Sequence, residues 1–172
     1  PWECPALPAG FRVRAADGVG GLARRRIAYL AEPDLEVEAW LLEPPGTAPP
    51  GGRPGAIVFH STTDRTIDEV ADPDPDAPAA IGTWLAQAGF VVARLAARHP
   101  GARGMRKLLH DGIRAVDVLA AVEGVDAARI VAAGHSLGAK ETLYLAAFDE
   151  RVRGAVASEG GIAIPFSNWT AP

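Results

Sequence analysis

Residues 134–138 are Gly-His-Ser-Leu-Gly, so that two glycines flank a serine at the spacing G-x-S-x-G. This pattern is typical of a nucleophilic serine on a sharp turn between a strand and a helix. The hydroxyl of such a serine attacks a carbonyl carbon when a general base, usually histidine, removes its proton. The pattern therefore predicts nucleophilic catalysis by Ser136, but no histidine follows His135 before Pro172.

The segments on both sides of Ser136 fit such a turn. The sequence predicts a buried strand over 129–133 and a helix over 139–148. In the strained backbone of this turn, side chains at the two glycine positions would collide with the neighbouring strand and helix. The amide of Leu137 can then point at a developing oxyanion near the helix N-terminus. The alternative is a structural serine in a glycine-rich turn.

The rest of the chain alternates between short hydrophobic runs and helical patterns. This alternation predicts an α/β fold with a mostly parallel sheet, right-handed crossovers and helices on both faces, in three layers. An opening pair of strands within 24–44, joined at Pro33-Asp34, supplies an antiparallel edge. We expect one domain over 1–172, with further strands at 56–59, 90–93 and 154–157 and further helices at 79–88 and 105–122.

Composition excludes several classes of function. The chain has 172 residues, a net charge of −4 and 48% hydrophobic residues, which gives no case for binding nucleic acid or an anionic membrane. Cys4 is the single cysteine, so no internal disulfide or cysteine-based metal site is expected. No apolar run approaches the ~20 residues of a membrane span. The basic residues are mostly arginine and alanine is abundant, which indicates a GC-rich bacterial genome. No cofactor, compartment or oligomeric state is predicted, and the start at Pro1 without methionine suggests a trimmed N-terminus.

An acidic segment spans 64–76 and contains six aspartate or glutamate residues among several prolines. The alternative is a calcium site, but the segment lacks the EF-hand spacing and its glycine. We therefore expect an extended, solvated connector and no metal site.

With these elements in order, the chain resembles the α/β-hydrolase fold over nearly its whole length. In that family the second oxyanion amide comes from the loop after the third strand, often His-Gly-Gly. Here that loop follows Phe59, and His60 matches while Ser61 and Thr62 replace the glycines. The resemblance implies the amide of Thr62, with Ser61 and Thr63 as alternatives, and it makes His60 a candidate substrate contact. The alternative is that these side chains only cap the strand.

Glu159 is the candidate acid of the triad. It follows the predicted strand 154–157, at the carboxyl edge where parallel sheets place active sites, 23 residues after Ser136. The alternative is a glutamate at a strand end that faces solvent.

This arrangement resembles the glucuronoyl esterases and related carbohydrate esterases, such as acetyl xylan esterases. Their nucleophile motif is G-C-S-R-x-G-K, and a glutamate follows the next strand. Lys140 matches the motif lysine, which binds a sugar hydroxyl in that family, whereas Leu137 and Ala139 depart from its arginine and glycine. The alternative for Lys140 is a solvated side chain in the first turns of a helix.

The base is the missing part of this triad. The order in the family is nucleophile, acid, histidine, but His60, His99, His110 and His135 all precede Ser136. None of the four is predicted as the base. We expect an incomplete hydrolase whose last strands and histidine lie beyond the sequence, with little turnover from residues 1–172 alone. Phe166, Asn168 and Trp169 either line the entrance over Ser136, which makes Trp169 a candidate substrate contact, or pack under the missing segment.

The resulting expectation is a serine hydrolase that cleaves carboxylic esters through an acyl-enzyme, with a small-molecule or carbohydrate ester as substrate. A dienelactone-hydrolase-like esterase and an oligopeptidase catalytic domain remain open, because the fold does not fix the substrate. From another class, a relative that keeps the fold only for binding also remains open.

Overall fold

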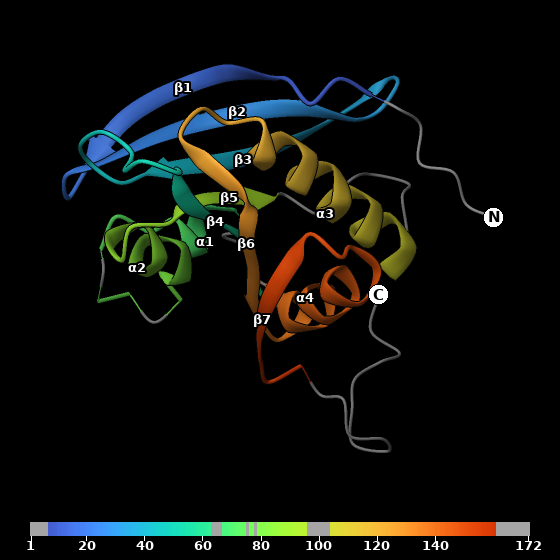
Figure 1. The fold of residues 1–172 in the computed structure, drawn as a ribbon. Coiled ribbons are helices and arrows are strands. Elements are labelled where there is room, and N and C mark those ends of the chain that lie inside the picture. The colour runs from blue at the N-terminus through green and yellow to red at the C-terminus, as the bar shows by residue number, and fades with distance from the viewer. Residues whose placement is uncertain (1–6, 63–66, 75, 78, 96–103, 161–172) are drawn as a thin grey trace.

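A computed structural model describes residues 7–160, apart from 63–66, 75, 78 and 96–103. Over these residues, seven strands form one sheet in the order β1-β2-β3-β5-β4-β6-β7 (Figure 1). The elements are β1 (Phe11–Val19), β2 (Leu22–Glu32), β3 (Leu35–Glu43), β4 (Arg53–Phe59), α1 (Ile67–Val70), α2 (Ile81–Gln87), β5 (Val91–Leu95), α3 (Met105–Ala120), β6 (Val125–His135), α4 (Leu137–Phe148) and β7 (Val152–Ser158).

The sheet has a parallel half and an antiparallel half. Strands β5, β4, β6 and β7 are parallel, while β1, β2 and β3 pair antiparallel and β3 joins β5 antiparallel. This confirms the predicted mixed α/β sheet with an antiparallel N-terminal edge. The helices predicted at 79–88, 105–122 and 139–148 correspond to α2, α3 and α4.

Strand β1 was not predicted from the sequence. Most of its side chains are exposed, so no hydrophobic alternation marks it. It is held by its pairing with β2, and Arg14 forms an ion pair with Glu36 of β3 at 2.8 Å. The signal that could have found it is Gly20-Gly21, whose φ angles of 58° and 80° form the two-residue turn between Val19 and Leu22.

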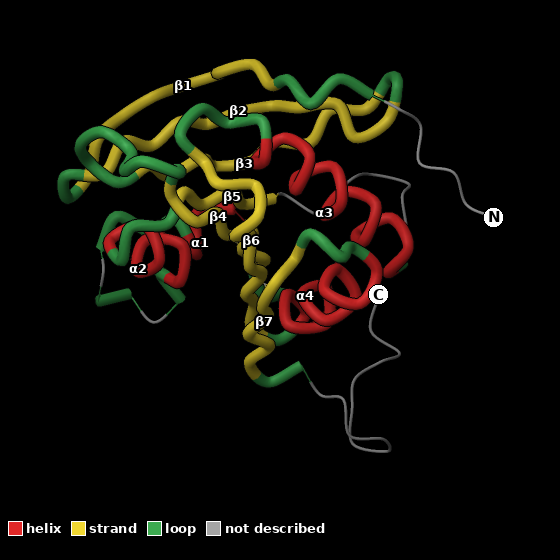
Figure 2. The backbone as a smooth tube through the Cα atoms, viewed as in Figure 1, coloured by secondary structure: helices red, strands yellow, loops and turns green. Residues whose placement is uncertain are grey.

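Helices cover both faces of the sheet, which gives the predicted three layers. Helices α3 and α4 pack on one face, and α1 and α2 pack on the other (Figures 1 and 2). Successive residues of a strand serve the two cores because their side chains alternate. Ile57 and Leu41 lie in the core under α3 and α4, whereas Val58 and Leu42 lie in the core under α1 and α2.

The acidic segment is not the extended, solvated connector that its composition indicated. Within it α1 forms a helical turn, and Ile67 and Val70 are buried in the core beside α2. The carbonyl of Asp72, also buried, accepts a hydrogen bond from Thr83 Oγ1 of α2 at 2.7 Å. Ile67 and Val70 are apolar and three residues apart, and this spacing is the sequence signal that could have predicted the helical turn. In the part of the chain that the structure describes, no cluster of three or more His, Cys, Asp or Glu side chains could hold a metal ion.

None of the described helices combines the length and the hydropathy that crossing a membrane requires.

A buried acidic side chain lies where α3 and α4 meet. Glu141 of α4 is 2% exposed, and burial, together with the nearby charge of Asp111, raises its pKa to about 8. Asp111 is itself buried and pairs with Lys107, which also reaches Glu32 at 3.1 Å. Gly112 of α3 faces the same packing, and a Cβ there would lie 3.2 Å from the ring of Phe59 and 3.4 Å from Leu145 of α4.

The raised pKa of Glu141 predicts a pH-dependent stability. The folded state keeps this carboxyl protonated up to about pH 8, whereas the unfolded chain ionises it near its ordinary pKa of 4.5. Between these values the unfolded state binds fewer protons, so the free energy of unfolding should fall by about 1.4 kcal/mol per pH unit as the pH rises. Glu141→Gln has no carboxyl to ionise here, so this pH dependence should disappear. The free energy of unfolding of the variant should therefore rise relative to that of the native chain as the pH rises to about 8.

Urea denaturation of both chains at pH values from 5 to 9 measures this difference. The exposed Glu150, changed to Gln, serves as a control that should follow the native profile. Parallel profiles for the native chain and Glu141→Gln would contradict the prediction.

Candidate active site

Ser136 joins the last residue of β6 to the first residue of α4 in strained backbone. Its φ of 57° and ψ of −115° lie in a region that residues with a Cβ rarely adopt, at a cost of about 1–3 kcal/mol. Its amide donates to the carbonyl of Ser158 at 2.9 Å, and its carbonyl accepts from the amide of Ala139 at 3.1 Å. The amide and the carbonyl of Ser136 are therefore both hydrogen-bonded, and these bonds hold the serine at the carboxyl end of β6.

The two flanking glycines are sterically required, as the sequence predicts. A Cβ at Gly134 would lie 2.3 Å from the carbonyl oxygen of Gly138. A Cβ at Gly138 would lie 2.6 Å from the carbonyl oxygen of Phe59 and 2.7 Å from that of His60. These contacts pack the first turn of α4 directly against the end of β4.

The same packing brings the two candidate oxyanion segments together. Leu137 is the first residue of α4, where amides have no acceptor within the helix. Thr62 lies exposed in the loop that follows β4. The Ser61 amide donates to Glu69 Oε2 at 3.4 Å, which favours Thr62 over Ser61 as the second donor. The roles of Leu137 and Thr62 stay predictions, and the alternative donor Thr63 lies outside the described residues.

Glu159 follows β7, the strand beside β6. Because the two strands are parallel and His135 pairs with Ser158, the residues after them, Ser136 and Glu159, emerge at the same edge of the sheet. Glu159 has a φ of 55°, and its carboxylate is 80% exposed. In the part of the chain that the structure describes, Ser136 and Glu159 are the two residues other than glycine with a positive φ.

The partner of this carboxylate was not predicted from the sequence. Glu159 Oε2 lies 3.2 Å from Nε2 of His135, the residue before the candidate nucleophile. The register of the parallel strands is the signal that could have found this contact, because it places His135 beside Ser158.

The other histidines lie elsewhere. His60 is buried with Nδ1 against the carbonyl of Ser61, and His110 is buried on α3 with Nε2 against the carbonyl of Ala31. No histidine is hydrogen-bonded to Ser136 among the described residues. His99 lies outside these residues.

Two of the remaining candidates are buried. Lys140, one turn into α4, is buried at 3% exposure, and so is His60. Their roles as substrate contacts stay predictions. Three further candidates lie outside the described residues: Phe166, Asn168 and Trp169. The contact of Trp169 with a substrate therefore stays a prediction.

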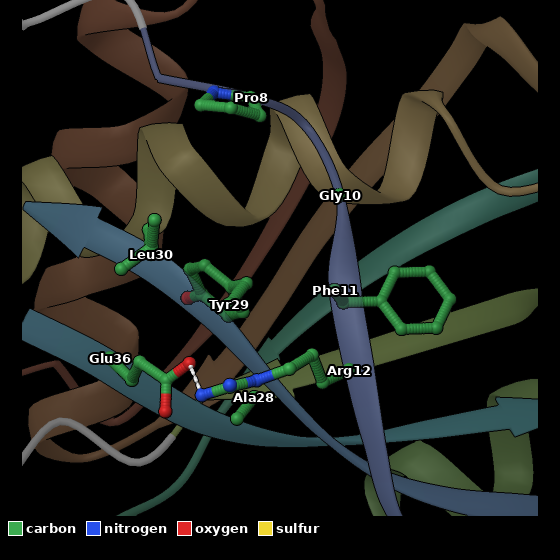
Figure 3. Close-up of a pocket in the computed structure, with 8 residues that line it drawn as sticks. All are labelled: Pro8, Gly10, Phe11, Arg12, Ala28, Tyr29, Leu30 and Glu36. Carbon is green, nitrogen blue, oxygen red and sulfur yellow. Dashed lines mark hydrogen bonds and ion pairs between the residues drawn. The ribbon is translucent and has the colours of Figure 1, made fainter. Parts of the chain in front are cut away.

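A separate hollow of about 430 Å³ lies at the opposite edge of the sheet (Figure 3). It is lined mainly by apolar groups of β1, β2 and the segment before them. Arg12 of β1 and Glu36 of β3, which form an ion pair, also line it. Because β6 and β7 form the other end of the strand order, this hollow does not belong to the Ser136 site.

Comparisons with known proteins place the fold. No protein-family model matches the chain, and no curated protein matches it in sequence. Solved structures do match. An acetyl xylan esterase from Paenibacillus sp. R4 superposes with a TM-score of 0.65 at 20% identity, over 86% of this chain and 52% of that one. A glucuronoyl esterase from Solibacter usitatus gives 0.64 at 18% identity, over 90% and 53%.

A third similar structure, a cold-adapted esterase from an Arctic intertidal metagenomic library, gives a TM-score of 0.65 at 17% identity, over 85% of this chain and 64% of that one. The chain spans about half the length of most of these structures. It thus has part of an α/β-hydrolase-like fold, which confirms the predicted resemblance at the level of the fold, and its structural neighbours are ester hydrolases.

The contact at Gly134 predicts that this position tolerates no side chain. Gly134→Ala should lower the free energy of unfolding by about 3 kcal/mol, because its methyl group meets backbone that cannot move aside. Gly154→Ala on the neighbouring strand is the matched control, since its Cβ would meet only Val131 Cγ1 at 3.6 Å. Urea denaturation measures both, and equal stabilities would refute the steric requirement.

The strain at Ser136 predicts that glycine fits this position better than alanine. Ser136→Gly removes the Cβ and accepts a positive φ, whereas Ser136→Ala keeps the strain. Glycine also costs entropy on folding, so we expect Ser136→Gly to be more stable than Ser136→Ala by about 1 kcal/mol. Thermal unfolding of the two variants decides the point, and a less stable glycine variant would show that the turn is not strained.

Proposed function

We propose that this protein is a serine hydrolase that cleaves carboxylic esters, with Ser136 as its nucleophile. One observation carries the proposal: the two residues that sequence reasoning selects as nucleophile and acid are also the two described non-glycine residues with a positive φ. Strained backbone of this kind is retained where function requires it. Their positions at the ends of adjacent parallel strands add the expected geometry.

The reaction follows from the groups around Ser136. Its Oγ attacks the ester carbonyl, and the amides of Leu137 and Thr62 donate to the oxyanion of the tetrahedral intermediate. The intermediate collapses with loss of the alcohol, and water then hydrolyses the acyl-enzyme. The partial positive charge at the N-terminus of α4 favours the same oxyanion.

The proton of Ser136 goes to a histidine outside the described residues, which then gives it to the departing alcohol. Glu159 orients that imidazole. Support comes from the exposure of the Glu159 carboxylate, which leaves it able to turn from His135 towards a second imidazole.

A carbohydrate ester is the substrate that we propose within this class. Support comes from the position of Lys140 four residues after Ser136 and from the acetyl xylan and glucuronoyl esterases among the similar structures. His60 and Trp169 are the proposed further contacts to such a substrate.

A fluorophosphonate probe tests the proposal on the full-length protein. The probe should form a covalent adduct that peptide mass spectrometry maps to Ser136, and Ser136→Ala should give none. Glu159→Gln should lower ester hydrolysis by about 10³–10⁴-fold, because the base loses its orienting acid. Glu150→Gln is the matched control and should keep native activity. An unlabelled Ser136 would reject the hydrolase and favour a protein that keeps the fold for binding.

A further inference from the structure

The loop after β4 is held by a carboxylate that the proposed reaction does not use. We define the oxyanion loop as His60, Ser61 and Thr62. Ser61 Oγ lies 2.9 Å from Glu69 Oε2 and 3.1 Å from Oε1, and the Ser61 amide donates to Oε2 at 3.4 Å. Both donors of Ser61, hydroxyl and amide, thus bind one carboxylate.

Glu69 is fixed because the short helix that carries it is fixed. On either side of it, Ile67 and Val70 of α1 are buried against the sheet. Asp68 Oδ1 accepts a hydrogen bond from Trp40 Nε1 of β3 at 2.8 Å. Arg24 Nη1 of β2 donates to the carbonyl of Ala71 just beyond α1 at 2.8 Å. The Glu69 carboxylate therefore has a set position relative to the sheet.

The oxyanion loop is also held from the opposite side. The carbonyl oxygens of Phe59 and His60 lie so close to Gly138 that a Cβ there would come within 2.7 Å of either. The loop thus runs between the first turn of α4 and the Glu69 carboxylate. The Thr62 N–H belongs to the planar peptide bond after Ser61, whose carbonyl lies against Nδ1 of His60. The Glu69 contacts on the hydroxyl and amide of Ser61 and the His60 contact on its carbonyl together restrict the direction of that N–H.

We propose that Glu69 is a positioning residue that sets the Thr62 amide for the oxyanion of the reaction. This inference rests on the proposed function. An oxyanion donor works only when it is held about 2.7–3.1 Å from the site of the developing charge. The hydroxyl of Ser61 donates a hydrogen bond to the Glu69 carboxylate, which a glycine at this position could not do. The negative charge of Glu69 itself opposes an oxyanion, so its contribution is the hydrogen bonds and not the charge.

Four variants of the full-length protein separate this role from a structural one. Glu69→Ala removes both contacts, Ser61→Ala removes only the hydroxyl, and Glu69→Gln keeps acceptor oxygen without the charge. Asp68→Ala is the matched control, because it loosens the same helix from Trp40 while leaving the contact to Ser61. For each we measure kcat and KM on p-nitrophenyl acetate, the rate of fluorophosphonate labelling of Ser136, and Tm.

Glu69→Ala should lower kcat and the labelling rate by about 10–100-fold with KM within twofold, because only the transition state uses the Thr62 amide. Ser61→Ala should fall between this variant and the native protein, and Glu69→Gln should recover most of the rate. Asp68→Ala should lower Tm but lower kcat by less than twofold, because buried Ile67 and Val70 and the hydrogen bond from Arg24 still hold the helix. Ser61→Ala lies on the loop, so it still tests the role if Glu69→Ala does not fold.

Three results would overturn the inference. If the native protein is reactive and folded Glu69→Ala is equally reactive, the positioning role of Glu69 is rejected. The proposed hydrolase function is not affected by that result. Equal losses of kcat in Glu69→Ala and Asp68→Ala assign the effect to the stability of α1. An unreactive Ser136 in the native protein rejects the proposed function and this inference together.

Discussion

The close contact between the turn at Ser136 and the end of β4 is the constraint on which the candidate site depends. Backbone at φ 57° and ψ −115° persists only where its surroundings hold it. Here the carbonyl of Ser158 on β7 holds the Ser136 amide, and the backbone at Phe59 and His60 lies against Gly138. The turn therefore needs β4 and β7 on the two sides of β6, which is the order that the sheet has.

That strand order also explains why the candidate residues meet although they are far apart in sequence. Parallel neighbours end at the same edge of a sheet, so the loop after β4, the turn after β6 and Glu159 after β7 lie side by side. The antiparallel strands add no candidate residue to this edge. They extend the two hydrophobic cores that hold the parallel strands in place, through residues such as Ile27 and Leu41 on one face and Leu42 on the other.

The parts of this architecture that the sequence reveals are those with a local signal. Buried strands, the glycines at the turn and a glutamate at a strand end can all be found from residue types and spacing. Strand β1 lacks that signal because its side chains are exposed, and the acidic residues of α1 conceal two apolar positions. The contacts of Glu69 with Ser61 and of Glu159 with His135 depend on tertiary geometry, and polar pairs leave no periodic pattern. Burial of Glu141 is hidden for the same reason, since a glutamate on a helix ordinarily faces solvent.

Several features that violate local rules lie around the turn at Ser136. Two positive φ angles outside glycine lie at the ends of β6 and β7, and buried Lys140 and Glu141 follow in the first turns of α4. Strained backbone and buried ionisable groups each cost free energy, which an ordinary packing position would avoid. The strained backbone at Ser136 and Glu159 therefore supports the proposal of chemistry at this serine, because a position that serves packing alone has no need of such strain.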